Sequence, residues 1–212
     1  MRIPLIQDLV GFTEKHRARC CVDNSMVWLI IVTGLPAAGK STLGTWLGKQ
    51  LRFPFICKDS IKEILFDELG WSDREWSQKL GAASVEMMYS FAQVSLMAGK
   101  SIILENTFRP DLASAKISAL ARQAQAGTIQ IICRATSNRV YQRFKQRAEA
   151  GLRHPGHLDL QILREPMVPL EDRPLRLELS GEAIEVDTTD FSAVSFESIL
   201  EQVKAILRKA QR

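Results

Sequence analysis

Short apolar runs alternate along the chain with longer segments in which apolar residues recur at helical spacing. Continuous apolar runs are typical of parallel strands that are covered on both faces; they occupy residues 27–33, 53–57, 101–104, 128–133 and 183–186. The segments between and after them predict helices over residues 40–51, 60–69, 73–98, 110–126, 139–150, 159–165 and 195–209. This alternation predicts an α/β fold in which a parallel sheet carries helices on both faces.

Length and composition set the domain organisation. At 212 residues and 46% hydrophobic, the chain can bury one good core but not two large ones. We expect one domain over residues 26–212, preceded by an arm or helix formed by residues 1–25. The large apolar residues between 71 and 98 are expected to pack in the core rather than to line a pocket. Their helical spacing favours that interpretation.

No apolar run approaches the roughly 20 residues that cross a bilayer, and the N-terminus lacks the pattern of a secretion signal. A cytoplasmic protein without membrane contact is therefore expected. The net charge of +4 is mild. This charge is compatible both with an enzyme that binds triphosphates and with a protein that binds nucleic acid. Charge alone therefore does not separate these two classes.

The most specific motif is G-x-x-x-x-G-K-[ST], which follows the first predicted strand and opens the first predicted helix. It reads Gly34, Leu35, Pro36, Ala37, Ala38, Gly39, Lys40, Ser41, and Thr42 comes next. Glycines let successive backbone N–H groups surround phosphate oxygens at the positive end of a helix. Lys40 would reach the β- and γ-phosphates, Ser41 would ligate Mg²⁺, and Thr42 would lie near the α-phosphate. The motif predicts ATP and Mg²⁺ as cofactors.

Two other classes of P-loop protein are excluded by what surrounds the motif. GTPases read guanine with an Asn/Thr-Lys-x-Asp tetrapeptide, which this chain lacks. Residues 179–181 weakly resemble the signature loop of ABC-type ATPases. However, the strand that ends at Asp187 follows too closely to leave room for the intervening helix. The pattern of a small kinase remains.

Asp59 and Lys62 are candidates for the acceptor site. Asp59 follows the second predicted strand, and the carboxyl ends of parallel strands meet at one cleft. A carboxylate there can orient or deprotonate an attacking hydroxyl, or hold water on Mg²⁺. The alternative is a cap for the helix at 60–69. Lys62, one turn further on, can bind an anionic group of the acceptor or be an ordinary surface lysine.

Glu105 and Arg109 follow the third predicted strand. Glu105 is a candidate to hold Mg²⁺ through water, and Arg109 a candidate to clamp an anion of the substrate. For both residues the alternative is an ordinary charge at the protein surface.

A row of arginines follows the fourth predicted strand. Arg139, Arg143 and Arg147 are spaced by four and share one helical face. Guanidinium groups can stack on adenine and stabilise a transferred phosphoryl group, although a solvated basic face is the usual alternative. Arg153 lies in a Gly- and Pro-containing loop that predicts a lid over about residues 147–165, from which this arginine would close on the phosphates.

Together these motifs resemble the P-loop kinase superfamily, in particular small bacterial kinases related to polynucleotide kinase, zeta toxin and chloramphenicol phosphotransferase. The residues that carry the resemblance are 34–42, 58–60, Lys62, 102–107, Arg143, Arg147, 153–157 and 186–189. The resemblance implies a three-layer P-loop NTPase fold, with a five-stranded parallel sheet in the order 2-3-1-4-5 and a lid after strand four.

The resemblance also implies roles for single residues. Asp59 would be the base or the carboxylate that orients the substrate. Arg143 would stack on adenine, Arg147 would contact the phosphates in the transition state, and the loop at Thr188 would border the base. Two positions depart from the family: Glu105 stands where many relatives have Asp, and Lys62 stands where polynucleotide kinase has Arg.

These observations favour an ATP-dependent kinase that phosphorylates a hydroxyl of a small molecule. A polynucleotide 5′-hydroxyl kinase is an alternative, less favoured because lysine lacks the bidentate grip of arginine. The alternative outside enzymes is a regulatory ATP-binding module that engages a protein partner through residues 1–25 and the lid.

Overall fold

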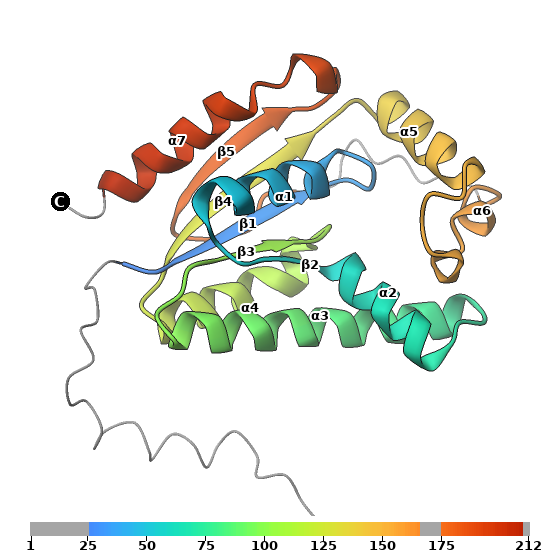
Figure 1. The fold of residues 1–212 in the computed structure, drawn as a ribbon, viewed down its shortest axis with the longest axis horizontal. Helices are drawn as coiled ribbons and strands as arrows, with labels where there is room; N and C mark the ends of the chain where they lie inside the picture. The colour runs from blue at the N-terminus through green and yellow to red at the C-terminus, as the bar shows by residue number, and fades with distance from the viewer. Residues whose placement is uncertain (1–25, 166–174, 210–212) are drawn as a thin grey trace, which may run out of the picture.

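The computed structural model describes residues 26–165 and 175–209, so the arm expected at residues 1–25 lies outside the described part. Five parallel strands form one sheet in the order β2-β3-β1-β4-β5 (Figure 1). This confirms the predicted fold class and strand order. In chain order the strands are β1 (Trp28–Gly34), β2 (Phe55–Cys57), β3 (Ile102–Glu105), β4 (Gly127–Arg134) and β5 (Glu182–Asp187).

Helices cover both faces of the sheet (Figure 1). The α-helices are α1 (Lys40–Leu51), α2 (Lys58–Leu69), α3 (Arg74–Met97), α4 (Pro110–Gln123), α5 (Ser137–Glu149), α6 (Asp159–Ile162) and α7 (Phe196–Lys209). Helices α1 and α7 pack on one face, and α3 and α4 pack on the other, where α2 lies against α3. Helices α5 and α6 lie beyond the carboxyl ends of the strands.

The core consists of two apolar layers, one on each face of the sheet. Strand β1 is buried along its whole length because helices cover both of its sides. Its alternate residues enter opposite layers: Ile30 packs with Leu43 of α1, and Ile31 packs with Met88 of α3. Within the described residues, no helix is long and apolar enough to cross a membrane.

Element boundaries differ from the predicted ones mainly around β2 and α2. Helix α2 begins at Lys58 rather than at residue 60, so Asp59 lies in its first turn and does not cap it. Asp73 does cap α3, because its side chain accepts a hydrogen bond from the backbone N–H of Trp76 (2.8 Å). The expectation that the large apolar residues of 71–98 are core holds for Met88 but is wrong for Phe91, which is 46% exposed.

The sheet register brings the end of β3 between the ends of two other strands. Glu105 pairs with Cys57 of β2 on one side and with Val32 of β1 on the other. The loop after β1 leads directly into α1. Residues at the ends of three strands therefore meet the first turn of α1 at one edge of the sheet.

The close packing of α1 on β2 generates a prediction about Gly44. A Cβ at Gly44 would overlap the ring of Phe55, whereas a Cβ at Gly81 of α3 would meet its nearest neighbour at 3.7 Å, an ordinary contact. We expect Gly44→Ala to lower the free energy of unfolding by about 1–3 kcal/mol through overpacking. The matched variant Gly81→Ala should leave it unchanged or raise it by up to ~1 kcal/mol, since alanine favours helix. Urea unfolding measures both; equal effects would contradict this packing.

Candidate active site

The phosphate-binding motif forms the loop between β1 and α1. Gly34 and Gly39 have φ angles of 148° and 83°, a region that other residues rarely adopt. A side chain at Gly39 would also overlap the ring of Phe191. Lys40 is 7% exposed, and its Nζ donates to the carbonyl oxygen of Leu35 within the same loop (2.8 Å). The loop is therefore shaped as phosphate binding requires.

A buried carboxylate lies beneath this loop. Glu105 is 4% exposed and accepts hydrogen bonds from Ser41 Oγ (2.9 Å) and Cys57 Sγ (2.8 Å). Its other oxygen lies 3.7 Å from Lys40 Nζ. Burial, followed by the neighbouring Glu105, raises the pKa of Cys57 to about 11, so the thiol keeps its proton and can donate. Burial likewise lowers the pKa of Lys40, and Glu105 opposes that shift.

The donors around Glu105 fit Mg²⁺. Ser41 and Glu105 offer a hydroxyl and a carboxylate oxygen, the hard ligands that this ion prefers. No group of three or more His, Cys, Asp or Glu side chains in the described residues could hold a metal by itself. A magnesium ion here would therefore take its other ligands from nucleotide phosphates and water, as in many kinases. When bound, it would neutralise charge on the phosphate oxygens.

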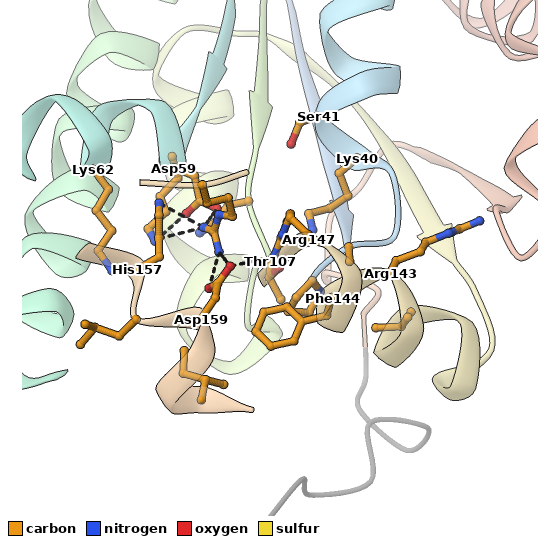
Figure 2. A pocket seen from close by; sticks show the side chains of 18 of the residues that line it. Lys40, Ser41, Asp59, Lys62, Thr107, Arg143, Phe144, Arg147, His157 and Asp159 are labelled. Atoms are coloured by element: carbon orange, nitrogen blue, oxygen red, sulfur yellow. Dashed lines mark hydrogen bonds and ion pairs between the residues drawn. The ribbon is translucent and has the colours of Figure 1, made fainter. Parts of the chain in front are cut away.

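A cleft of about 840 Å³ opens in front of the loop. Figure 2 shows residues from three helices around it: Lys40 and Ser41 from α1, Asp59 and Lys62 from α2, and Arg143 and Arg147 from α5. Of the residues expected in the site, those lining the cleft are Pro36, Ala37, Gly39, Lys40, Ser41, Thr42, Asp59, Lys62, Glu105, Arg143, Arg147 and Arg153. The structure thus brings together residues from both halves of the chain.

Asp59 is held by two cations. Its carboxylate contacts Lys58 Nζ at 3.0 Å and Arg153 Nη2 at 2.5 Å. Burial opposes ionisation, but the charges of Lys58 and Arg153 outweigh it and hold the pKa of Asp59 well below its usual range. The carboxylate therefore stays ionised at neutral pH. Such a group accepts a hydrogen bond well but is a weak base.

The segment after α5 is seated on α2 and α3. Arg153 bridges Asp59 and Asp159, and the Ser77 hydroxyl donates to the carbonyl oxygen of Gly156 (2.9 Å). His157 lies between Arg153 and Glu63 (Nε2 to Oε1, 2.9 Å). Burial, followed by the charge of Arg153, lowers the pKa of His157 to about 3, so the ring is neutral at pH 7 and its contact with Glu63 is a hydrogen bond.

Two arginines of α5 face the cleft with unused donors. Arg143 donates to the carbonyl oxygen of Thr189 (3.1 Å), and its guanidinium carbon lies 5.8 Å from the centre of the Phe191 ring. Arg147 lies 3.7 Å from Asp159. Within the described part of the chain, Arg143 Nη1 and Arg147 Nε are buried without a hydrogen-bond partner. Buried donors of this kind are usually paired, so they indicate a missing acceptor such as a phosphate oxygen.

Some expected site residues lie outside the cleft. Arg109 pairs with Asp111 at an exposed position (side chain 70% exposed), so the structure does not support it as a substrate clamp. Thr188 is fully buried and donates to the carbonyl oxygen of Arg134 (2.9 Å). Its neighbour Thr189 supplies the backbone contact to Arg143 instead.

Three residues of the phosphate loop also lie away from the cleft surface. The side chains of Leu35 and Ala38 are buried in the apolar layer beneath α1, and Gly34 packs against the backbone of Cys133. They can shape the loop or offer backbone groups, but not side-chain contacts.

The sequence reasoning missed several residues of the site. Arg74 and Asp159 line the cleft, and Phe191 packs on Gly39. Asp159 had a usable signal, since an acidic residue opens the helix predicted after the arginine-containing loop. Arg74 and Phe191 carry no local pattern that separates them from surface residues.

The Glu105 cluster generates a prediction about magnesium. We expect Glu105→Gln to preserve shape and the hydrogen bond with Ser41 but to remove the negative charge. The dissociation constant for ATP in the presence of Mg²⁺ should then rise about 10-fold, while binding of ATP in EDTA should change little. Fluorescent-nucleotide titrations with and without Mg²⁺ measure this; an equal loss under both conditions would contradict a metal role.

Comparisons with known proteins agree with this geometry. Residues 29–165 match a family described as an AAA domain. A candidate kinase from Chloroflexus aurantiacus is 37% identical, with a TM-score of 0.77 over 88% of this chain and 98% of that chain. The Mycobacterium tuberculosis APS kinase, in complex with AMPPNP and APS, is 13% identical with a TM-score of 0.51 over 87% of this chain and 98% of that chain, and shares the fold.

A curated relative matches over a shorter segment. Mouse adenylate kinase 8 is 29% identical over 90 residues, which is 42% of this chain but only 18% of that protein. The match to the AAA domain spans more than half of the chain, and the Chloroflexus structure is similar over nearly all of it. The protein therefore belongs to the AAA domain family and is a member of the P-loop kinase superfamily.

Proposed function

We propose that the protein transfers the γ-phosphate of ATP to a hydroxyl group of a small-molecule acceptor. The observation that carries this proposal is the position of Asp59, an ionised carboxylate that lines the same cleft as Lys40 of the phosphate loop. A carboxylate opposite a γ-phosphate can orient an acceptor hydroxyl and accept its proton.

The residues divide into those that hold the nucleotide and those that meet the transferred group. Lys40 and the backbone N–H groups of the loop would bind the β- and γ-phosphates. Arg143, next to Phe191, would stack on adenine, and the unused donor of Arg147 would bind the phosphoryl group as its charge moves. The resemblance to P-loop kinases supports this division, and both arginines line the cleft.

Asp59 would orient the acceptor rather than act as a strong base. Transfer forms a bond from the acceptor oxygen to phosphorus and breaks the bond from phosphorus to the β-phosphate oxygen, so ADP leaves. Because the transition state is loose, the acceptor hydroxyl would lose its proton late in the transfer. The proton can then pass through Asp59 to the transferred phosphate. The contact between Arg153 and Asp59 must break first, and Arg153 would then be free to bind the phosphates.

The central prediction concerns Asp59. We expect Asp59→Asn to lower acceptor-dependent ADP release by about 10²–10⁴-fold, with the dissociation constant for ATP nearly unchanged. Glu68→Gln is the matched control, because Glu68 lies on the same helix but is exposed. The assay screens sugars, nucleosides, amino sugars and a 5′-hydroxyl oligonucleotide as acceptors.

Two outcomes of this assay would count against the proposal. If only the oligonucleotide stimulates ADP release, the acceptor is a polynucleotide end. If ATP binds but no acceptor changes ADP release in either variant, the protein is better described as a regulatory ATP-binding module.

The two arginines of α5 should affect different kinetic constants. Arg143→Ala should raise KM for ATP about 10-fold with a smaller effect on kcat, because it removes a stacking surface. Arg147→Ala should lower kcat by about 10²-fold or more, because it removes a donor to the transition state. Lys145→Ala, which removes an exposed cation of the same helix, is the control. Identical effects of the two arginine variants on KM and kcat would overturn this division of roles.

A further inference from the structure

Lys62 is a buried cation without a buried counter-charge. It is 8% exposed and lines the cleft, and its Nζ donates to the hydroxyl of Ser77 (2.8 Å). Among the described residues, no carboxylate lies within 4.0 Å of this nitrogen. Burying an ammonium group without an opposite charge costs free energy. The hydrogen bond to Ser77 and the contact of Nζ with the Phe66 ring (5.0 Å to its centre) offset part of this cost, but neither supplies a negative charge, which an anionic ligand would.

A second ammonium group approaches the same point. Lys58 and Lys62 are spaced by four residues on α2 and share one face of the helix. A Cβ built on Gly81 of α3 would lie 3.7 Å from Lys62 Nζ and 3.8 Å from Lys58 Nζ. Both nitrogens therefore converge on a site where α3 carries no side chain. Their mutual repulsion adds to the cost of keeping both charges there.

The carboxylates of this half of the cleft already have partners. Asp59 contacts Lys58 and Arg153, and Asp159 contacts Arg153 and Arg147. Glu165 contacts Arg74. Among the described residues, Lys62 has no carboxylate partner; its Nζ contacts only the Ser77 hydroxyl and the ring of Phe66 (5.0 Å to the ring centre). It lies about one helical turn (~5 Å) from Asp59 on the same helix. Figure 2 shows both side chains on the α2 side of the cleft.

We propose that the acceptor is an anion, whose carboxylate or phosphate binds Lys62 and Lys58 while its hydroxyl lies on Asp59. This inference rests on the proposed function, since it names the class of acceptor that the kinase would use. The short spacing selects small hydroxy acids, sugar acids or sugar phosphates over neutral sugars. The added anion would supply the counter-charge that the described residues do not give to Lys62.

Matched pairs of acceptors test this proposal. Glycerate is compared with glycerol, galacturonate with galactose, and ribose 5-phosphate with ribose; the first two pairs probe a carboxylate and the third a phosphate. In any pair that contains a substrate of the enzyme, the kcat/KM for the acid should be at least about 10-fold higher than for its neutral partner. Equal or better use of the neutral partner would overturn the proposal.

Substitutions of Lys62 separate a binding role from a structural one. Lys62→Met should raise KM for the acid about 10- to 100-fold, a larger effect than on kcat, on KM for ATP or on KM for the neutral partner. It should also unfold at a higher temperature than the wild type, because it removes a buried charge. Lys62→Arg should restore part of the preference for the acid, whereas a purely structural lysine would show no such pattern.

The pH dependence gives a second signature. Burial, followed by the charge of Lys58, lowers the pKa of Lys62 to about 8; the other charges that act on it are Asp59, Arg153 and Asp159. An anion binds the protonated form, so KM for the acid should rise as the pH increases from 7 to 9 and Lys62 loses its proton. In Lys62→Arg, KM should stay flat over this range, because arginine keeps its charge. A flat profile in the wild type would contradict the proposal.

Binding without turnover separates this inference from the kinase assignment. With the nucleotide site saturated by a non-hydrolysable ATP analogue and Mg²⁺, acetate and inorganic phosphate are titrated while the side-chain NMR signals of Lys62 are followed. We expect a saturable shift in the wild type and a weaker one in Gly81→Ala, whose methyl group would lie within 3.8 Å of both ammonium groups. A shift without turnover of any acceptor would refute the kinase but keep the anion site. Turnover of an acceptor without such a shift would support the kinase and refute the anion site.

Discussion

The buried carboxylate of Glu105 imposes the tightest constraint on this molecule. A buried carboxylate requires partners that donate hydrogen bonds or carry positive charge, because leaving it unpaired costs several kcal/mol. Here the partners come from two elements: Ser41 and Lys40 from the start of α1, and Cys57 from the end of β2. Satisfying Glu105 therefore fixes the phosphate loop against the ends of two strands. The same contacts hold the hydroxyl of Ser41 and the carboxylate of Glu105 where they could bind a nucleotide-bound magnesium ion.

In the rest of the cleft, most charged side chains form ion pairs, and a few polar or charged groups do not. Arg153 connects the acceptor side to the segment after α5 by bridging Asp59 and Asp159. In the proposed reaction, an incoming hydroxyl would compete with this arginine for Asp59, and acceptor binding would then be coupled to rearrangement of the segment. The groups left over are the donors of Arg143 and Arg147 on the nucleotide side and the ammonium group of Lys62 on the acceptor side. They are the features that a bound ATP and an acidic acceptor would satisfy.

The sequence predicts the parts of the structure that depend on local pattern. Apolar runs give the strands, and the strict spacing of the phosphate loop gives its position. Long-range pairing is not encoded in this way: the contact of Asp59 with Arg153 joins residues far apart in the chain. Short-range competition is also hard to foresee, as with Arg109, which pairs with the nearby Asp111 instead of reaching the cleft. Phe91 shows a third limit, because helical spacing does not reveal which apolar face is covered.

The most direct measurement of the central claim follows the transferred phosphate itself. The protein is incubated with ATP whose γ-phosphate carries ¹⁸O and with a pool of small metabolites, and mass spectrometry then finds every product that contains the label. Phosphoryl transfer to an acidic acceptor predicts a new labelled phosphomonoester that also bears a carboxylate or a second phosphate. Label that appears only in inorganic phosphate, or in an ester of a neutral alcohol, would contradict it.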